Sequence, residues 1–157
     1  MTRVADALGG SVHQEWTVEG KPAWRELPDG SREEWTWDGE GNLLRYTDRM
    51  GRVRAHSYTQ LDLPLETSAE ETSYTFTHDT ELRLTQVTNS DGASWTYVYD
   101  LAGLLFEERD FDGRSMTYTY DAVGRLVARR NAAGQVLEYE RDVLGRVERV
   151  THVLGRT

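Results

Sequence analysis

A recurring aspartate is the feature of this chain whose spacing first suggests chemistry. Asp79, Asp100, Asp121 and Asp142 follow one another at 21-residue intervals, and Asp38 belongs to the same series. A row of carboxylates could hold metal ions, but a Ca²⁺ site needs several oxygen ligands that converge within one loop. Each repeat offers one Asp at this phase, and such a side chain at the start of a turn accepts backbone N–H groups. We therefore expect these residues to cap turns and to bind no metal.

Neighbouring acids suggest a second kind of chemistry, the hydrolysis of a glycosidic bond. That reaction needs two carboxylates roughly 5 to 10 Å apart on either side of a cleft. Adjacent residues of a strand point to opposite faces of a sheet, so such neighbours cannot share a substrate. We expect them to form a solvated charged surface. The pairs are Glu33 with Glu34, Glu107 with Glu108, and Asp110 with Asp112.

The histidines and serines stand outside any catalytic or metal-binding motif. The chain has no Cys, no Gly-x-Ser-x-Gly segment and no pair of His residues at the spacing of a zinc site. His56 and His78 stand where other repeats carry aromatic rings, which indicates ring substitution. The sequence thus predicts a protein that is not an enzyme and that has no catalytic residue, metal or cofactor. The residues considered are His13, His56, His78, His152, Ser31, Ser94 and Ser115.

Charge and composition exclude further classes of function. The chain has 27 acidic and 18 basic residues, a net charge of −9, so it would repel nucleic acid and anionic membranes over most of its surface. The basic residues are Arg apart from Lys21. Arg83, Arg125 and Arg146 recur at one phase after the turns, and we expect each to pair with acids on a neighbouring hairpin.

No segment is typical of a membrane span or a secretory signal peptide. The first residues lack a basic stretch followed by an apolar one, and no window approaches 18 apolar residues. We expect export, if it occurs, to depend on another part of the protein.

A repeat of about 21 residues organises the chain. Residues 120–126 read Tyr-Asp-Ala-Val-Gly-Arg-Leu, and related segments lie 21 residues earlier at 99–105 and 21 later at 141–147. The series continues back to Trp16 in seven copies, with one residue deleted between Thr59 and Asp79. A second glycine series lies between these segments, from Gly9 to Gly155, and is interrupted near residues 70–72. Such periodicity indicates a repeat architecture.

Each repeat carries the signals of β-hairpins. Aromatic residues alternate with Thr before the turns, so the rings share one face of a strand. The Asp can accept N–H groups two or three residues on, and the Gly three places later can supply the positive φ of the turn. We assign the structural motif to Tyr99, Asp100, Gly103, Tyr120, Asp121, Gly124, Arg125, Leu126, Asp142, Gly145 and Arg146.

The aromatic stripe has two interpretations. Buried rings would pack between strands, whereas exposed rings would bind a sugar or a partner protein. Because nearly every repeat carries these rings, packing is favoured. The candidates for ligand-facing aromatic residues are Trp35, Trp37, Trp95, Tyr97 and Tyr118.

The predicted fold is an all-β array of tandem antiparallel hairpins. Residues 1–157 would form a single array of about seven repeats, degenerate before residue 74, with about seven residues in each strand. An open sheet rarely exceeds about ten strands without curling. We therefore expect a curved, spiralling sheet, with its aromatic face toward the concave side or a packed layer. Because the chain begins and ends near the same phase, we interpret it as a fragment of a longer array.

The motif at residues 120–126, repeated with this period, resembles the YD repeat of Rhs proteins, Tc-toxin C subunits and teneurins. The resemblance covers essentially the whole chain and is strongest from Tyr74 to Val150. It implies a ribbon that spirals into a hollow shell, which encloses a C-terminal toxic domain in bacterial members and serves adhesion in teneurins. Residues 1–157 lack the Asp-Pro-rich junction that marks self-cleavage in the family, so we expect any toxic or proteolytic activity of a parent protein to lie outside them.

The leading functional hypothesis is a non-catalytic wall segment of an Rhs-type polymorphic toxin shell. The resemblance implies neighbouring repeats and an enclosed toxin cargo as partners, and delivery to the cell exterior as part of a larger bacterial protein. The alternative is a carbohydrate- or protein-binding adhesion module that uses the aromatic face; a hydrolase ranks third. Unpaired strands at both ends of the sheet also predict self-association through open edges.

Overall fold

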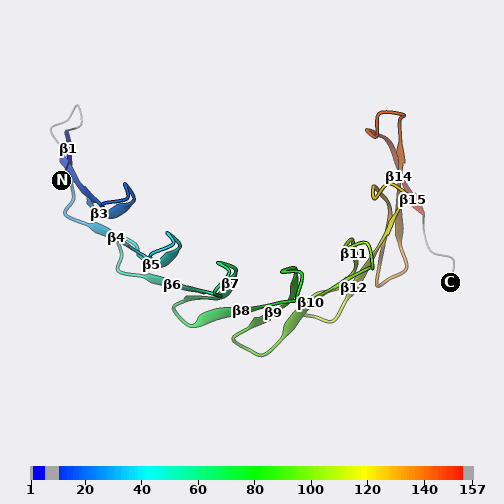
Figure 1. Ribbon diagram of the computed structural model, residues 1–157, viewed down its shortest axis with the longest axis horizontal. Coiled ribbons are helices and arrows are strands. Elements are labelled where there is room, and N and C mark those ends of the chain that lie inside the picture. The colour runs from blue at the N-terminus through cyan, green and yellow to red at the C-terminus, as the bar shows by residue number, and fades with distance from the viewer. Residues whose placement is uncertain (1, 6–10, 154–157) are drawn as a thin grey trace. The chain divides into compact units, whose positions relative to one another are not determined.

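The computed structural model describes residues 2–5 and 11–153, and these contain strands and turns but no helix. No helix in this part of the chain could therefore cross a membrane. From β2 onward, each strand is joined to the next by a short turn (Figure 1). The strands are β1 (Thr2–Ala5), β2 (Ser11–Trp16), β3 (Pro22–Glu26), β4 (Arg32–Trp37), β5 (Leu43–Thr47), β6 (Val53–Tyr58), β7 (Pro64–Ala69), β8 (Thr72–His78), β9 (Leu84–Asn89), β10 (Ser94–Tyr99), β11 (Leu105–Arg109), β12 (Ser115–Tyr120), β13 (Leu126–Asn131), β14 (Val136–Arg141) and β15 (Val147–Val153).

The strands pair antiparallel with their neighbours in sequence. Contacts divide the chain into two compact units, Met1–Phe76 and Thr77–Thr157. In the first unit Trp35 on β4 lies opposite Tyr46 on β5, and in the second Tyr97 on β10 lies opposite Glu108 on β11. The order of strands in the sheet is their order in the sequence, and the sheet is open. The predicted all-β array of tandem antiparallel hairpins is confirmed, whereas its spiral curvature stays a prediction.

The turns fall where both glycine series place them. At the turn after β10, the Asp100 N–H donates to the Leu104 carbonyl at 2.9 Å, and the Gly103 N–H donates to the Asp100 carbonyl at 3.0 Å. Gly103 adopts a φ of 81°, which glycine tolerates best because it lacks a Cβ. The pairing register shifts at Val98/Tyr99, as expected for a three-residue hairpin loop closed by a bulge.

Two repeats form the same turn without glycine at the left-handed position. Asp62 and Leu82 take φ values of 58° and 65° there. The hydrogen bonds are those of the glycine turns. The backbone N–H of Asp62 donates to the Thr59 carbonyl, and the backbone N–H of Leu82 donates to the Asp79 carbonyl, each at 3.1 Å. The hairpin geometry is therefore repeated even where the glycine is not.

The single deletion in the repeat lies in the turn between β7 and β8. Ala69 pairs directly with Thr72 there, so the loop contains only Glu70 and Glu71. Glu70 has a φ of 53°, the positive value that a two-residue hairpin loop requires at its first position. A loop one residue shorter than its counterparts accounts for the 20-residue spacing from Thr59 to Asp79. Gly9 and Gly155, the ends of the second glycine series, lie outside the described residues.

Residues 11–153 contain no buried apolar side chain. Glu33, with 9% of its surface exposed, is the one buried residue among them. Most aromatic rings are half-buried, and a few of them pack against one another, such as Trp35 on Tyr46 and Tyr97 on Trp95. A sheet with no layer packed on it lacks the apolar burial that normally stabilises a domain.

Candidate functional site

The tyrosine that precedes the turn aspartate reaches back to the preceding repeat. The hydroxyl of Tyr120 donates to the Leu105 carbonyl at 2.9 Å, and that of Tyr99 donates to the Leu84 carbonyl at 2.8 Å. The paired register of β11 and β12 ends at Glu107, so Leu105 lies beyond the backbone ladder. The hydroxyl thus supplies a donor where the strands diverge. We call this side-chain bridge between consecutive repeats the clasp.

Other flat side chains form the clasp in some repeats. The Trp37 indole N–H donates to the Pro22 carbonyl at 2.8 Å, and the Arg141 Nη2 donates to the Leu126 carbonyl at 3.0 Å. In the first unit the Tyr58 hydroxyl forms the same clasp with the Leu43 carbonyl. What these residues share is a donor at the far end of a planar group. Sequence reasoning placed the rings on one face but missed their carbonyl partners, because backbone acceptors leave no residue signal.

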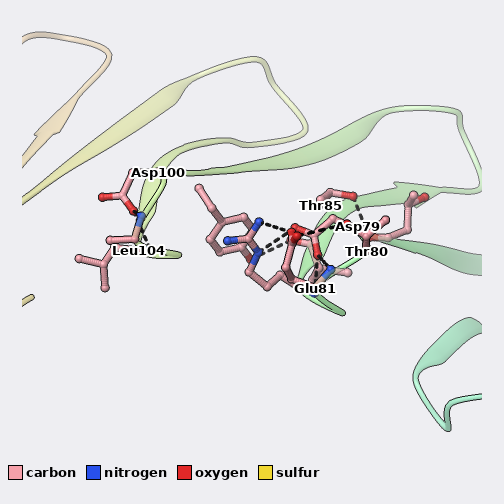
Figure 2. Close-up of polar contacts among 11 residues, drawn as sticks. Asp79, Thr80, Glu81, Thr85, Asp100 and Leu104 are labelled. Atoms are coloured by element: carbon pink, nitrogen blue, oxygen red, sulfur yellow. Dashed lines mark hydrogen bonds and ion pairs between the residues drawn. The ribbon is translucent and has the colours of Figure 1, made fainter.

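Each turn aspartate binds the backbone of its own turn, and where an arginine follows, that side chain as well. The Oδ1 of Asp121 accepts the N–H of Val123 at 3.1 Å and of Arg125 at 2.9 Å, while Arg125 Nε donates to Oδ2 at 2.7 Å. The capped groups are therefore two and four residues on, whereas the sequence suggested two or three. Turn capping itself is observed, and Figure 2 shows the turns that begin at Asp79 and Asp100.

The expected arginine pairs across neighbouring hairpins are wrong. Arg83, Arg125 and Arg146 each form an ion pair with the aspartate of their own turn, at 2.7, 2.7 and 2.6 Å. A residue four places after the Asp returns directly above its carboxylate because the turn reverses the chain between them. Each guanidinium is therefore paired within its own turn.

These contacts lower the pKa of the Asp121 and Asp142 carboxyls. The Arg125 backbone N–H is the main cause at Asp121; desolvation opposes it, and the Arg125 side chain adds to the lowering of the pKa. At Asp142 the Arg146 side chain is the main cause of the lowered pKa, followed by the Arg146 backbone N–H. Both carboxylates therefore stay ionised at neutral pH and serve as acceptors.

Turns of the Asp series, such as those that begin at Asp79 and Asp100, also contact one another. The residue that ends one of these turns reaches the next turn of the same series. The Arg83 guanidinium lies 4.7 Å from the centre of the Tyr99 ring, and a Cβ at Gly103 would lie 3.4 Å from Arg83 Nη1. In the first unit the amide of Asn42 donates to the Asp62 carboxylate at 2.9 Å. Turns that lie one repeat apart thus stack on one another. Glycine leaves space for the long side chain of the preceding repeat.

Several of the candidate catalytic groups are engaged in structural contacts. Asp110 and Asp112 do converge, but on Arg114, at 2.8 and 2.6 Å. His56 Nδ1 lies 2.9 Å from the Thr67 hydroxyl, and the Ser94 hydroxyl bonds with Gln86. Among the residues that the structure describes, no three His, Cys, Asp or Glu side chains are grouped to hold a metal ion.

The five candidate aromatic residues differ in what surrounds them. Trp37 belongs to a clasp, and the Trp35 ring packs on Tyr46 with centroids 5.4 Å apart. The Tyr97 ring stacks on Trp95 at 6.3 Å. Trp95 alone of the five lines a groove of about 550 Å³.

Tyr118 is fixed by a carboxylate. Its hydroxyl donates to Glu108 Oε1 at 2.6 Å. Burial, followed by this hydrogen bond, raises the pKa of Tyr118 far above its ordinary value. The hydroxyl therefore stays protonated and holds Glu108 in position.

Comparison with known proteins identifies the repeat. A model of the family described as RHS Repeat matches residues 78–115 and 117–157. The TcdB2-TccC3-Cdc42 crystal structure is similar over 91% of this chain and 9% of that one, at 14% identity and a TM-score of 0.72. The Photorhabdus luminescens Tc holotoxin pore is similar over 90% of this chain and 9% of that one, at 15% identity and a TM-score of 0.71. This chain therefore spans about a tenth of those chains. No curated protein matches it in sequence.

Proposed function

The chain belongs to the RHS repeat family, and on that premise we propose that it is a non-catalytic wall segment of an Rhs-type toxin encapsulation shell. In the proposal its hairpins contribute strands to a hollow container that holds a C-terminal effector. The observation that carries the proposal is a clasped hairpin array without any buried apolar side chain in residues 11–153. Such an array is built to continue a larger sheet.

The contacts of the repeat support a structural role. Turn carboxylates are saturated by N–H groups and arginines, and the ring hydroxyls of Tyr99 and Tyr120 are bound to carbonyls. A catalytic acid or nucleophile needs a free position beside a substrate. Here the carboxylates shape their own turns and the tyrosine hydroxyls hold consecutive repeats together, which is the requirement for a wall.

The partners in this proposal are adjacent repeats of a parent protein and the enclosed effector. Neighbouring repeats would extend the sheet beyond β15, which lies at an edge. Delivery to the exterior of a bacterial cell as part of a larger toxin follows from the same proposal. Self-association through the open edges is expected when the chain is isolated.

Limited proteolysis of the full-length protein tests the wall role. We expect its C-terminal region to resist protease in the intact protein and to be cleaved faster when Tyr99 and Tyr120 are both replaced by Phe, because the weakened array opens more often. The matched control is Tyr97→Phe, because no hydrogen bond from the Tyr97 hydroxyl is found within the described residues. Equal accessibility of the C-terminal region in the intact protein and in the double variant would contradict the proposal.

A binding role for the aromatic face is the second candidate function. The groove beside Trp95 favours it, since pockets of about 300 to 1,000 Å³ with apolar walls and a few polar groups are typical of ligand sites. Quenching of tryptophan fluorescence by a ligand, lost in a folded Trp95→Ala variant, is the expected result. A ligand that quenches Trp95→Ala equally would not use this groove.

A further inference from the structure

The groove in the second unit contains a carboxylate held by two neutral donors. Glu108 on β11 accepts the Tyr118 hydroxyl at 2.6 Å and the Trp95 indole N–H at 3.3 Å, one on each oxygen. Glu108 lies opposite Tyr97 and Met116 in the paired strands, so these side chains share one face. Tyrosine, carboxylate and indole thus form a fixed unit on that face.

A similar unit in the first part of the chain holds a guanidinium. The Tyr46 hydroxyl donates to Glu33 Oε1 at 3.0 Å, which corresponds to the bond between Tyr118 and Glu108. The second oxygen of Glu33 accepts Arg25 Nε at 2.8 Å. The Arg25 guanidinium also lies 5.9 Å from the centre of the Trp35 ring. Carboxylate and ring together therefore bind one cation.

A second precedent involves an indole bound to a glutamate, as at Trp95. Trp24 Nε1 donates to Glu15 at 2.6 Å, and the Arg32 guanidinium lies 4.5 Å from the centre of the Trp24 ring. Trp37 likewise carries Lys21, whose Nζ lies 4.8 Å from the ring centre. An aromatic ring attracts a cation to its face, most strongly when the cation is partly desolvated.

Trp95 and Glu108 have no such cation in the described part of the chain. The groove of about 550 Å³ is walled by Trp95, Met116 and the Ala132–Ala133 turn. Arg114 also lines it, but Asp110 and Asp112 already neutralise that guanidinium. Arg129 faces Tyr118 from β13 and lines a separate cavity of about 110 Å³.

We propose that this groove binds the arginine side chain of a partner protein. The guanidinium stacks on the Trp95 ring and forms an ion pair with Glu108, as Arg25 does with Trp35 and Glu33. Arginine fits better than lysine because its planar group can stack and donate at the same time. The net charge of −9 further favours a basic partner segment. This site sharpens the second candidate function and does not depend on the wall role.

Titration of the whole chain with N-acetyl-arginine methylamide tests the proposal, with the Trp95 indole N–H signal followed by NMR. We expect saturable movement of this signal with a dissociation constant in the millimolar range or weaker, since a single exposed contact of this kind contributes little. The neutral isostere N-acetyl-citrulline methylamide should bind at least about fivefold more weakly, because it lacks the charge. This comparison uses the unmodified chain and needs no variant.

Two matched variants locate the site. Glu108→Gln removes the charge and keeps one acceptor oxygen, which can take the Trp95 N–H while the amide N–H donates to the Tyr118 hydroxyl, and it should weaken binding of the arginine probe about fivefold. Glu107→Gln should leave binding unchanged, because Glu107 points to the opposite face and lies beside Arg109. Equal binding of the citrulline probe, an unchanged affinity in Glu108→Gln, or no movement of the Trp95 signal would overturn the proposal. Movement of that signal by a methyl pyranoside but not by the arginine probe would assign the groove to sugar and overturn it as well.

Discussion

The hydroxyl of Tyr120 donates a hydrogen bond to the carbonyl oxygen of Leu105, 15 residues earlier and in the preceding repeat, at 2.9 Å. Tyr99 and Leu84 repeat the relationship one period earlier. The motif tyrosine therefore acts at a distance of one repeat, while the aspartate beside it acts within its own turn. One residue joins the hairpins and the next shapes them.

Removal of the clasp hydroxyl should weaken the array without changing its fold. Tyr120→Phe leaves the Leu105 carbonyl without its donor, so we expect a loss of about 0.5 to 1.5 kcal/mol in the free energy of unfolding. Urea denaturation followed by circular dichroism measures this loss. Tyr97→Phe is the control, and an equal loss in both variants would show that the hydroxyl of Tyr120 has no special role.

Glycine should stabilise the array at Leu82. Leu82 has a φ of 65° and is 48% exposed, so Leu82→Gly relieves a left-handed side chain and sacrifices little burial. We expect a gain of up to about 1 kcal/mol, and a loss of about 1 to 2 kcal/mol for Gly103→Ala at the equivalent position. Thermal or urea unfolding of both variants measures the two changes, and destabilisation by Leu82→Gly would contradict this account of the turn.

Stability should fall in acid because the turn carboxyls titrate. Asp121 and Asp142 have a pKa below the ordinary value in the folded chain, owing to the N–H groups and side chains of Arg125 and Arg146. Their contribution is complete above the unfolded pKa of about 3.9 and is lost as the pH falls through the folded pKa. The free energy of unfolding should therefore be level from pH 7 to about 5 and decline below about 4.

Asparagine supplies the control for the acid effect. Asn89 caps its own turn through Oδ1, which accepts the N–H of Ala93 at 2.9 Å, so an amide suffices as acceptor. The double variant Asp121→Asn, Asp142→Asn should show a shallower decline in acid than the parent chain. An identical decline would mean that other carboxyls control the acid transition.

The turn that lost a residue should accept one again. Insertion of Gly between Glu71 and Thr72 restores a three-residue loop and leaves every strand register intact, so we expect a change within about 0.5 kcal/mol. The same insertion between Thr117 and Tyr118 in β12 moves the following side chains to the opposite face and should unfold that hairpin. Denaturation midpoints of the two variants distinguish a tolerant turn from an intolerant strand.

The periodic part of the fold could be predicted from the sequence. The alternating rings of Trp95, Tyr97 and Tyr99 predict a strand, and the glycines predict where the chain reverses. Leu43, Leu84, Leu105, Leu126 and Val147 each begin a return strand, as their phase after the turn indicates.

What the sequence could not show involves backbone acceptors and the path of long side chains. The partner of Tyr120 is a carbonyl, which every residue possesses, so no residue type indicates it. Arg125 turned out to bind Asp121 because the reversal of the chain brings them together, a geometry that residue counting alone does not distinguish from a bond to the next hairpin. The groove beside Trp95 likewise depends on residues from the strands β10 to β13 and from two turns, so it is defined only by their packing.

Engineered disulfides test most directly whether consecutive repeats continue one sheet in register. The chain has no Cys, so a pair introduced at Glu107 and Thr117, which face each other across β11 and β12, reports that register alone. We predict rapid cross-linking of the Glu107→Cys, Thr117→Cys variant under mild oxidation and slow cross-linking of Glu107→Cys, Met116→Cys, whose side chains point to opposite faces. Preferential cross-linking of the second pair, or none in the first, would contradict a wall built from clasped repeats.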